Sequence, residues 1–197
     1  MTEAVHDVAH EATHEAAHSG SGNARLIGLL ISLLALCLAV SEMLGKSAQT
    51  QGLALNIQAS DTWNFFQAKT IRQTVVRTAL ESAKLQQSGD KPELDKQIAA
   101  WQLAVSRLES EPSTNEGRKE LRQRASDMEH ERDRALGQYH AYEIASLILQ
   151  LGIVLASVAL LSSITAFAFG SVILGGAGLA LLAGTFFELP FVLALLH

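Results

Sequence analysis

The chain has 197 residues, of which 48% are hydrophobic and 18% are charged, and its formal net charge is −5. These averages conceal two compositions, because residues 26–44 and 144–197 together contain only two charged side chains, Glu42 and Glu188. The rest of the chain has the charge density of an ordinary soluble domain. This division excludes a single soluble globule, and the apolar content with a single cysteine excludes a disordered or disulfide-stapled chain.

Residues 1–25 form an acidic, histidine-rich tail that we expect to be flexible. His6, His10, His14 and His18 recur every four residues, so neighbouring imidazoles would share one face of a helix. Such a pair can bind zinc or copper, and one hypothesis is therefore a metal-responsive membrane protein. The tail has no core to organise it, so we favour a solvated tail and expect no cofactor.

Residues 26–44 are predicted to form the first transmembrane helix. An apolar run of this length covers the hydrocarbon core of about 30 Å, at about 1.5 Å per residue. The run follows an acidic tail in which only Arg25 is basic near the span. A signal peptide begins with a basic region, so we expect an uncleaved span.

Residues 45–143 are predicted to form a soluble, helical, coiled-coil-like insert between the first and second spans. Residues 46–143 contain 14 basic and 14 acidic side chains, and this balance argues against nucleic-acid binding. The first helix of the insert is expected over residues 53–87, ending before Pro92. Its apolar stripe consists of Phe65, Ala68, Ile71, Val75, Ala79 and Ala83.

Two further helices of the insert carry apolar residues at alternating spacings of four and three, which is typical of a coiled-coil seam. The first seam is Leu94, Ile98, Trp101, Val105 and Leu108. The second seam is Leu121, Ala125, Met128, Arg132, Ala135, Tyr139 and Tyr142, with arginine as the polar exception. Turn-forming residues at 111–117 lie between them and predict an antiparallel hairpin. The second helix is expected to continue unbroken into the second span.

Residues 59–73, with the sequence ASDTWNFFQAKTIRQ, resemble the signature of a family of bacterial membrane proteins known as domain of unknown function 4337. The arrangement of one span, a helical insert and two further spans is similar too. The resemblance implies a small integral membrane protein of unassigned function, and it implies no catalytic residues.

Within this signature, Trp63 and Phe66 share a helix face, and Asp61 and Lys69 lie beside it. One interpretation is a docking site for a partner or for another copy of the chain. The other interpretation, which we favour, is an aromatic core with an ion pair beside it.

Residues 144–197 are too long for one span and suit two, predicted at 144–168 and 171–196. The break is expected at Phe169-Gly170-Ser171, because glycine suits a tight turn. In the last helix, Gly176, Ala180 and Gly184 lie four residues apart. This small-residue face predicts close packing against another helix, in the same chain or in another copy.

The two acids in the apolar segments, Glu42 and Glu188, are candidates for an ion or proton path, because an intramembrane acid is costly. Glu188 lies two residues before Pro190, which removes a backbone hydrogen bond and can kink the helix. A small transporter or channel subunit that uses Glu188 is therefore an alternative function. Glu42 lies near the end of its span and can reach the membrane surface.

Enzyme signatures are missing from the sequence: we find no phosphate-binding glycine loop after a strand and no catalytic triad pattern. The leading hypothesis is a non-enzymatic scaffold or interaction subunit. Its expected partners are the lipid bilayer and another copy or another membrane protein. The resemblance implies a bacterial protein, which we expect in the inner membrane. Basic residues near the membrane ends lie mainly on the insert, so we expect the insert in the cytoplasm.

Overall fold

The structure is a computed structural model that describes residues 7, 11, 22–86, 92–162 and 164–187. It contains four helices, α2 (Gly22–Leu85), α3 (Pro92–Glu109), α4 (Arg118–Ser162) and α5 (Thr165–Phe186), and no strand among these residues. Three of them, α2, α4 and α5, are long and apolar enough to cross a membrane. The expectation of an all-α chain is therefore confirmed.

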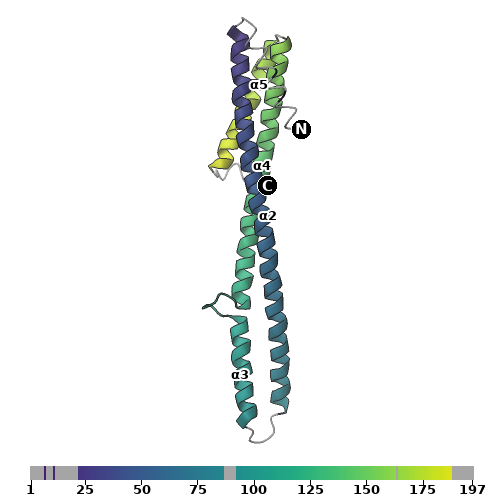
Figure 1. The fold of residues 1–197 in the computed structure, drawn as a ribbon, viewed down its shortest axis with the longest axis vertical. Helices are drawn as coiled ribbons and strands as arrows, with labels where there is room; N and C mark the ends of the chain where they lie inside the picture. The colour runs from purple at the N-terminus through teal and green to yellow at the C-terminus, as the bar shows by residue number, and fades with distance from the viewer. Residues whose placement is uncertain (1–6, 8–10, 12–21, 87–91, 163, 188–197) are drawn as a thin grey trace. The chain divides into compact units, whose positions relative to one another are not determined.

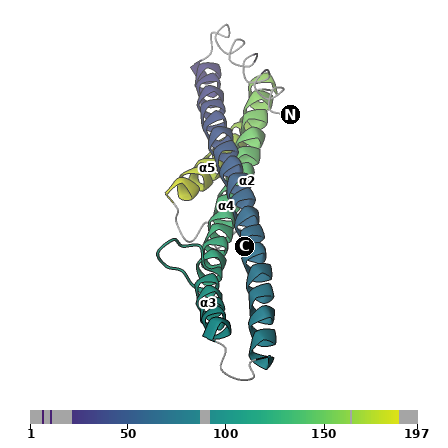
Figure 2. The ribbon, with the colours of Figure 1, turned by 60° about the horizontal axis from the view of Figure 1, so that its bottom comes forward.

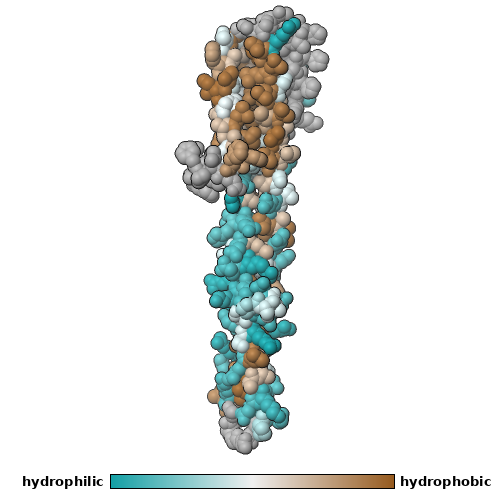
Figure 3. Space-filling view, turned by 90° about the vertical axis from the view of Figure 1, so that its left-hand side faces the viewer, coloured by the Kyte–Doolittle hydropathy of each residue, from teal (hydrophilic) through white to brown (hydrophobic). Residues whose placement is uncertain are grey.

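The chain divides into two compact units, which we name by composition. The apolar unit comprises Met1–Gln51 and Arg134–His197, and the polar unit comprises Gly52–Asp133. Hydrophobic side chains gather over the apolar unit and hydrophilic ones over the polar unit (Figure 3). Helices α2 and α4 each contribute residues to both units.

The first predicted span and the first helix of the insert are one continuous helix, α2, of 64 residues. We expected a new helix to begin at residue 53, but the chain is helical through Gly45 and Gly52. Gly45 is buried, and a Cβ at this position would lie 3.4 Å from the Cβ of Tyr142 on α4. This glycine therefore allows two helices to approach closely and does not end one.

The predicted antiparallel hairpin within the insert is wrong. Helix α3 and the first part of α4 lie end to end along α2, which both of them contact (Figures 1 and 2). Ile98 of α3 packs against Leu80 and Ala83 of α2, with Leu94 and Trp101 beside them. The seam residues were identified correctly, but they face α2 and not one another.

The turn between α3 and α4 projects from this pairing and does not reverse the chain (Figure 1). The backbone N–H groups of Thr114 and Asn115 both donate to the carbonyl oxygen of Glu111. Asn115 has a φ of 56°, a left-handed conformation that asparagine tolerates. A Cβ at Gly117 would lie 2.5 Å from the backbone nitrogen of Glu111, so only glycine fits where the turn enters α4.

Helix α4 runs without a break from the polar unit into the apolar unit, as predicted. It ends at Ser162, whereas the predicted break lay at residues 169–171 and the predicted spans were 144–168 and 171–196. The Ser162 hydroxyl donates to the Val158 carbonyl and accepts from the N–H of Ile164, which has an extended backbone. A polar hydroxyl thus satisfies the backbone at this turn, while Gly170 and Ser171 lie inside α5.

The core of the apolar unit is built by α2 and α4. Ile31, Leu34 and Leu38 of α2 pack with Leu149 and Ile153 of α4 in one buried cluster. Helix α5 packs on this pair, since Leu182 joins a second cluster with Tyr142 and Ala145 of α4.

Candidate functional site

The predicted face of α5 carries small residues, but the structure packs a neighbouring face. Gly176 and Ala180 are exposed, and a Cβ at Gly176 would meet nothing within 4 Å. A Cβ at Gly175 would lie 2.7 Å from Leu34 Cδ2, and one at Gly178 would lie 2.8 Å from Leu149 Cγ. Of the three predicted residues, only Gly184 is buried. Gly175 and Gly178 therefore make the close approach within the chain, and the Gly176–Ala180 face is uncovered.

A polar contact reinforces this packing between α4 and α5. The buried hydroxyl of Ser171 donates to the carbonyl oxygen of Gly152, at 2.8 Å. A Cβ at Gly152 would lie 3.4 Å from the backbone nitrogen of Gly175. Glycine on α4 and small residues on α5 therefore bring the two backbones together.

In the polar unit, Arg118 joins all three helices. Its Nε donates to Thr70 Oγ1 at 2.9 Å, and its Nη1 donates to Gln73 Oε1 at 2.5 Å and to Glu109 Oε2 at 2.6 Å. Its guanidinium also lies 5.2 Å from the ring centroid of Phe66, a cation–π distance. We name Arg118, Thr70, Gln73, Glu109 and Phe66 the Arg118 clasp.

Gln73 is the buried member of the clasp, with 7% of its surface exposed. Its amide nitrogen donates to Glu109 Oε2 at 2.8 Å and to the Val105 carbonyl at 3.3 Å, while its oxygen accepts from Arg118. A buried amide without partners is costly, so this pairing fixes the position of α3 along α2. The sequence did not indicate this role, because Gln73 shows no distinctive spacing.

Two carboxylates around the clasp are stabilised in their charged form. The hydrogen bond from Gln73 is the main cause that lowers the pKa of Glu109, and the charge of Arg118 adds to it. The hydrogen bond from the Ser110 hydroxyl lowers the pKa of Glu120 in the first turn of α4. The N–H of Glu111 also donates to Glu120, at 3.3 Å. These contacts tie the turn between α3 and α4 to the helices on either side.

The predicted docking residues make contacts inside the polar unit. Trp63 Nε1 donates to Glu129 Oε1 at 2.9 Å, and the rings of Trp63 and Phe66 meet edge to face at 5.4 Å. Lys69 pairs with Glu116 at 3.5 Å and not with Asp61, which is exposed. Trp63, Phe66 and Lys69 therefore hold α2 to the rest of the unit, and docking remains a prediction.

Most of the apolar stripe that the sequence indicated on α2 is exposed. Ile71 and Val75 are 65% and 63% exposed, and Phe65 is 39% exposed. The covered face of α2 carries Ala59, Gln73, Leu80 and Ala83. Because α2 bears apolar residues on two faces, the pattern did not distinguish the covered face from the exposed one.

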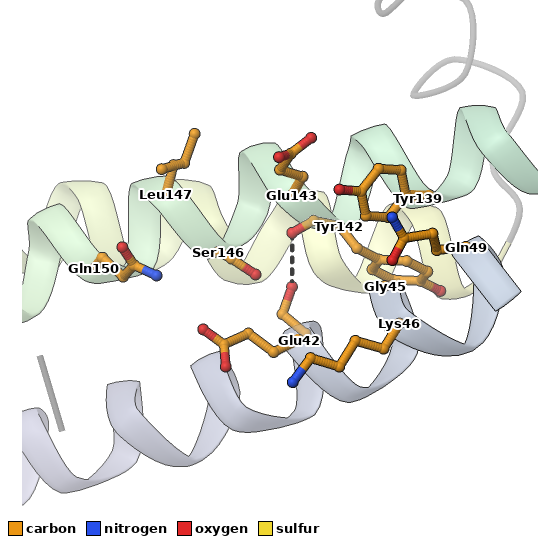
Figure 4. A pocket seen from close by; sticks show the side chains of 11 residues that line it. Glu42, Gly45, Lys46, Gln49, Tyr139, Tyr142, Glu143, Ser146, Leu147 and Gln150 are labelled. Atoms are coloured by element: carbon orange, nitrogen blue, oxygen red, sulfur yellow. Dashed lines mark hydrogen bonds between the residues drawn. The ribbon is translucent and has the colours of Figure 1, made fainter. Parts of the chain in front are cut away.

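A cavity of about 320 Å³ lies between α2 and α4 in the apolar unit (Figure 4). Polar side chains from both helices line it: Glu42, Lys46 and Gln49 of α2, and Glu143, Ser146 and Gln150 of α4. The buried hydroxyl of Ser41 donates to the Tyr142 carbonyl at 3.0 Å and holds the helices together at this level. The sequence singled out Glu42 but not the cavity, because about half of the lining comes from α4, a distant part of the chain.

The remaining predicted site residues lie outside the described part of the chain. These are Glu188 and the four histidines His6, His10, His14 and His18. Among the described residues, no group of three histidine, cysteine or acidic side chains is close enough to bind a metal. The metal and ion-path hypotheses for these five residues therefore stay predictions.

Comparison with known proteins places this architecture in a family. No curated protein and no solved structure matches the chain. Residues 23–188 match the family described as "Domain of unknown function (DUF4337)". This match covers α3, α4, α5 and all but the first residue of α2, and it includes the Arg118 clasp and the cavity beside Glu42. The chain belongs to the DUF4337 family.

Proposed function

We propose that this protein is a non-enzymatic scaffold of the bacterial inner membrane that crosses the bilayer three times and self-associates through its helices. The observation that carries the proposal is the exposed stripe of α2, formed by Phe65, Ala68, Ile71 and Val75. Side chains such as Ile71 and Val75 are stabilised when they leave water, so a second surface that covers them lowers the free energy.

The expected partner is a second copy of the chain. Copies inserted in one membrane share an orientation, so their α2 helices run parallel, and a twofold axis normal to the bilayer brings equivalent residues together. β-Branched residues such as Ile71 and Val75 suit parallel two-stranded packing. The exposed Gly176–Ala180 face of α5 supplies a further small-residue surface for helix association.

The oligomeric state in mild detergent tests this function. Wild-type protein should sediment as a dimer or larger oligomer, and Ile71→Glu should weaken association by about tenfold or more, because it places a charge in an apolar contact. Thr74→Glu is the matched control, since it places the same side chain at an exposed position of α2 on a face outside the stripe. A wild-type chain that is monomeric at every concentration would contradict the proposal.

In this proposal the polar unit lies in the cytoplasm, because the insert carries more basic residues near the membrane ends than the tail does. The insert contributes Lys46, Arg124, Arg132 and Arg134, and the tail contributes Arg25. A reporter protein that is active only in the cytoplasm should be active when it is inserted after Gly117. Activity of a periplasm-only reporter at that position would reverse the proposed topology.

A further inference from the structure

The cavity beside Glu42 contains a carboxylate oxygen that needs a hydrogen-bond donor. Glu42 Oε1 is buried, and no atom of the described residues donates a hydrogen bond to it. A buried, charged acceptor without a donor is costly, and a ligand that brings an N–H group would remove that cost. The cavity volume of about 320 Å³ is within the range of small-ligand sites.

The cavity also contains a cation that does not neutralise this acid. Lys46 follows Glu42 by one helical turn, a spacing that normally favours an ion pair. No ion pair within 4.0 Å joins them among the contacts of the described residues. Figure 4 shows both side chains extending in the same direction along α2, with Ser146 and Gln150 of α4 facing them. The cavity thus presents one negative and one positive group to the same space.

Glu143, the second acid of the cavity, does not converge on Glu42. In Figure 4 its side chain points away from α2, so the two carboxylates do not form a pair that would hold a metal ion. The amides of Gln49 and Gln150 and the hydroxyl of Ser146 provide neutral donors and acceptors around the two charges. Such a lining suits a ligand with separate positive and negative ends.

We propose that this cavity binds a zwitterionic group with a primary ammonium at one end and a phosphate at the other. The ammonium donates to Glu42, and the phosphate lies at Lys46. An aminophospholipid headgroup, such as that of phosphatidylethanolamine, and free phosphoethanolamine share this chemistry. The site lies at the end of the apolar part of α2, where lipid headgroups are available to a chain that spans a bilayer.

A comparison of a primary ammonium with a quaternary ammonium tests this proposal. Phosphatidylcholine has the same phosphate and the same positive charge, but its quaternary nitrogen has no N–H group and cannot satisfy Glu42 Oε1. The full-length protein in mild detergent should therefore bind dioleoylphosphatidylethanolamine about tenfold more tightly than dioleoylphosphatidylcholine, as measured by lipid titration with native mass spectrometry. Equal affinity for the two lipids would overturn the proposal.

Two variants test the recognition of the ammonium end and of the phosphate end separately. Glu42→Gln keeps the side-chain volume but replaces the charged acceptor with a neutral amide, so it should remove most of the preference for phosphatidylethanolamine. Lys46→Gln should weaken the binding of both lipids by a similar factor and leave the preference for phosphatidylethanolamine unchanged. Glu131→Gln, at an exposed position of α4 away from the cavity, is the control and should match wild type. A Glu42→Gln variant that keeps the preference and the wild-type circular dichroism would refute the role of Glu42.

Competition with soluble glycerophosphoethanolamine identifies the source of the ligand. If the headgroup in the bilayer is the ligand, the soluble compound should displace the lipid only at concentrations far above those of the lipid. Displacement at equal concentration supports the same recognition chemistry with a soluble ligand. Failure of both compounds to bind would overturn the proposal, and it would leave the self-association of the chain unaffected.

Discussion

The close contact between α5 and α4 predicts opposite outcomes for two glycines that lie two residues apart. Gly178→Ala would place a Cβ 2.8 Å from Leu149 Cγ and 2.9 Å from Leu149 Cδ2. Cγ is the branch point of this leucine and lies in a buried core, so it cannot move aside freely. Gly176→Ala adds the same methyl group where nothing lies within 4 Å.

The magnitudes follow from two opposing effects. Overpacking a core costs about 1–3 kcal/mol, whereas replacing glycine by alanine inside a helix gains about 1 kcal/mol. Gly178→Ala should therefore destabilise the apolar unit by up to about 2 kcal/mol, and Gly176→Ala should be neutral or stabilising. For a chain of this size, each kcal/mol shifts the unfolding midpoint by roughly 2–4 °C.

Cys37 provides the assay, because it is the only cysteine of the chain and packs beside the cluster that contains Leu182 of α5. Thermal unfolding in detergent can be followed by the reaction of this thiol with a thiol-reactive fluorophore. The midpoint of Gly178→Ala should lie below that of wild type, and the midpoint of Gly176→Ala should not. If both variants melt at the same temperature, the packing of α5 on Leu149 is incorrect.

Two predictions concern the Arg118 clasp. Arg118→Gln should destabilise the polar unit by about 1–2 kcal/mol, because it removes charge-assisted hydrogen bonds that are partly exposed. The control Arg122→Gln, on the same helix, should change stability by less than about 0.5 kcal/mol. Tryptophan fluorescence during denaturation measures the stability of both variants. The lowered pKa values of Glu109 and Glu120 mean that these groups stabilise the fold when charged. This stabilisation is present above their ordinary pKa of about 4.3 and is lost as the pH falls through the lower folded values. The same fluorescence assay, compared between neutral and acid pH, should show a smaller loss of stability for Glu109→Gln than for wild type. An equal loss in the two proteins would contradict the stabilising role of the charged Glu109.

The sequence predicted which residues are apolar and helical, but not which helices meet. The seams on α3 and α4 were correct in spacing, yet either a hairpin or a common partner satisfies such a pattern. The length of α2 decides the outcome, because one 64-residue helix provides a surface for both. Gln73 and Arg118 then fix the alignment through polar contacts that have no periodic signal.

The small residues of α5 likewise did not indicate which face packs within the chain. Residues 175–178 are Gly-Gly-Ala-Gly, so small side chains lie on several faces of the helix. Only the positions of Leu34 and Leu149 on the other helices select Gly175 and Gly178 for close packing. Gly170, predicted as a turn, lies within α5, where a Cβ would be 3.4 Å from Leu155. The cavity beside Glu42 was not predictable either, since it joins residues about one hundred positions apart.

Cysteine crosslinking in native membranes tests self-association through α2 most directly. In a Cys37→Ala background, Ile71→Cys places one thiol on the exposed stripe, and Arg77→Cys places one at an exposed position on another face of α2. Under mild oxidation of membrane vesicles, Ile71→Cys should form a disulfide-linked dimer, because equivalent residues meet across a parallel pair. Arg77→Cys should remain monomeric. Dimers from Arg77→Cys alone, or no dimer from Ile71→Cys, would contradict the proposed scaffold.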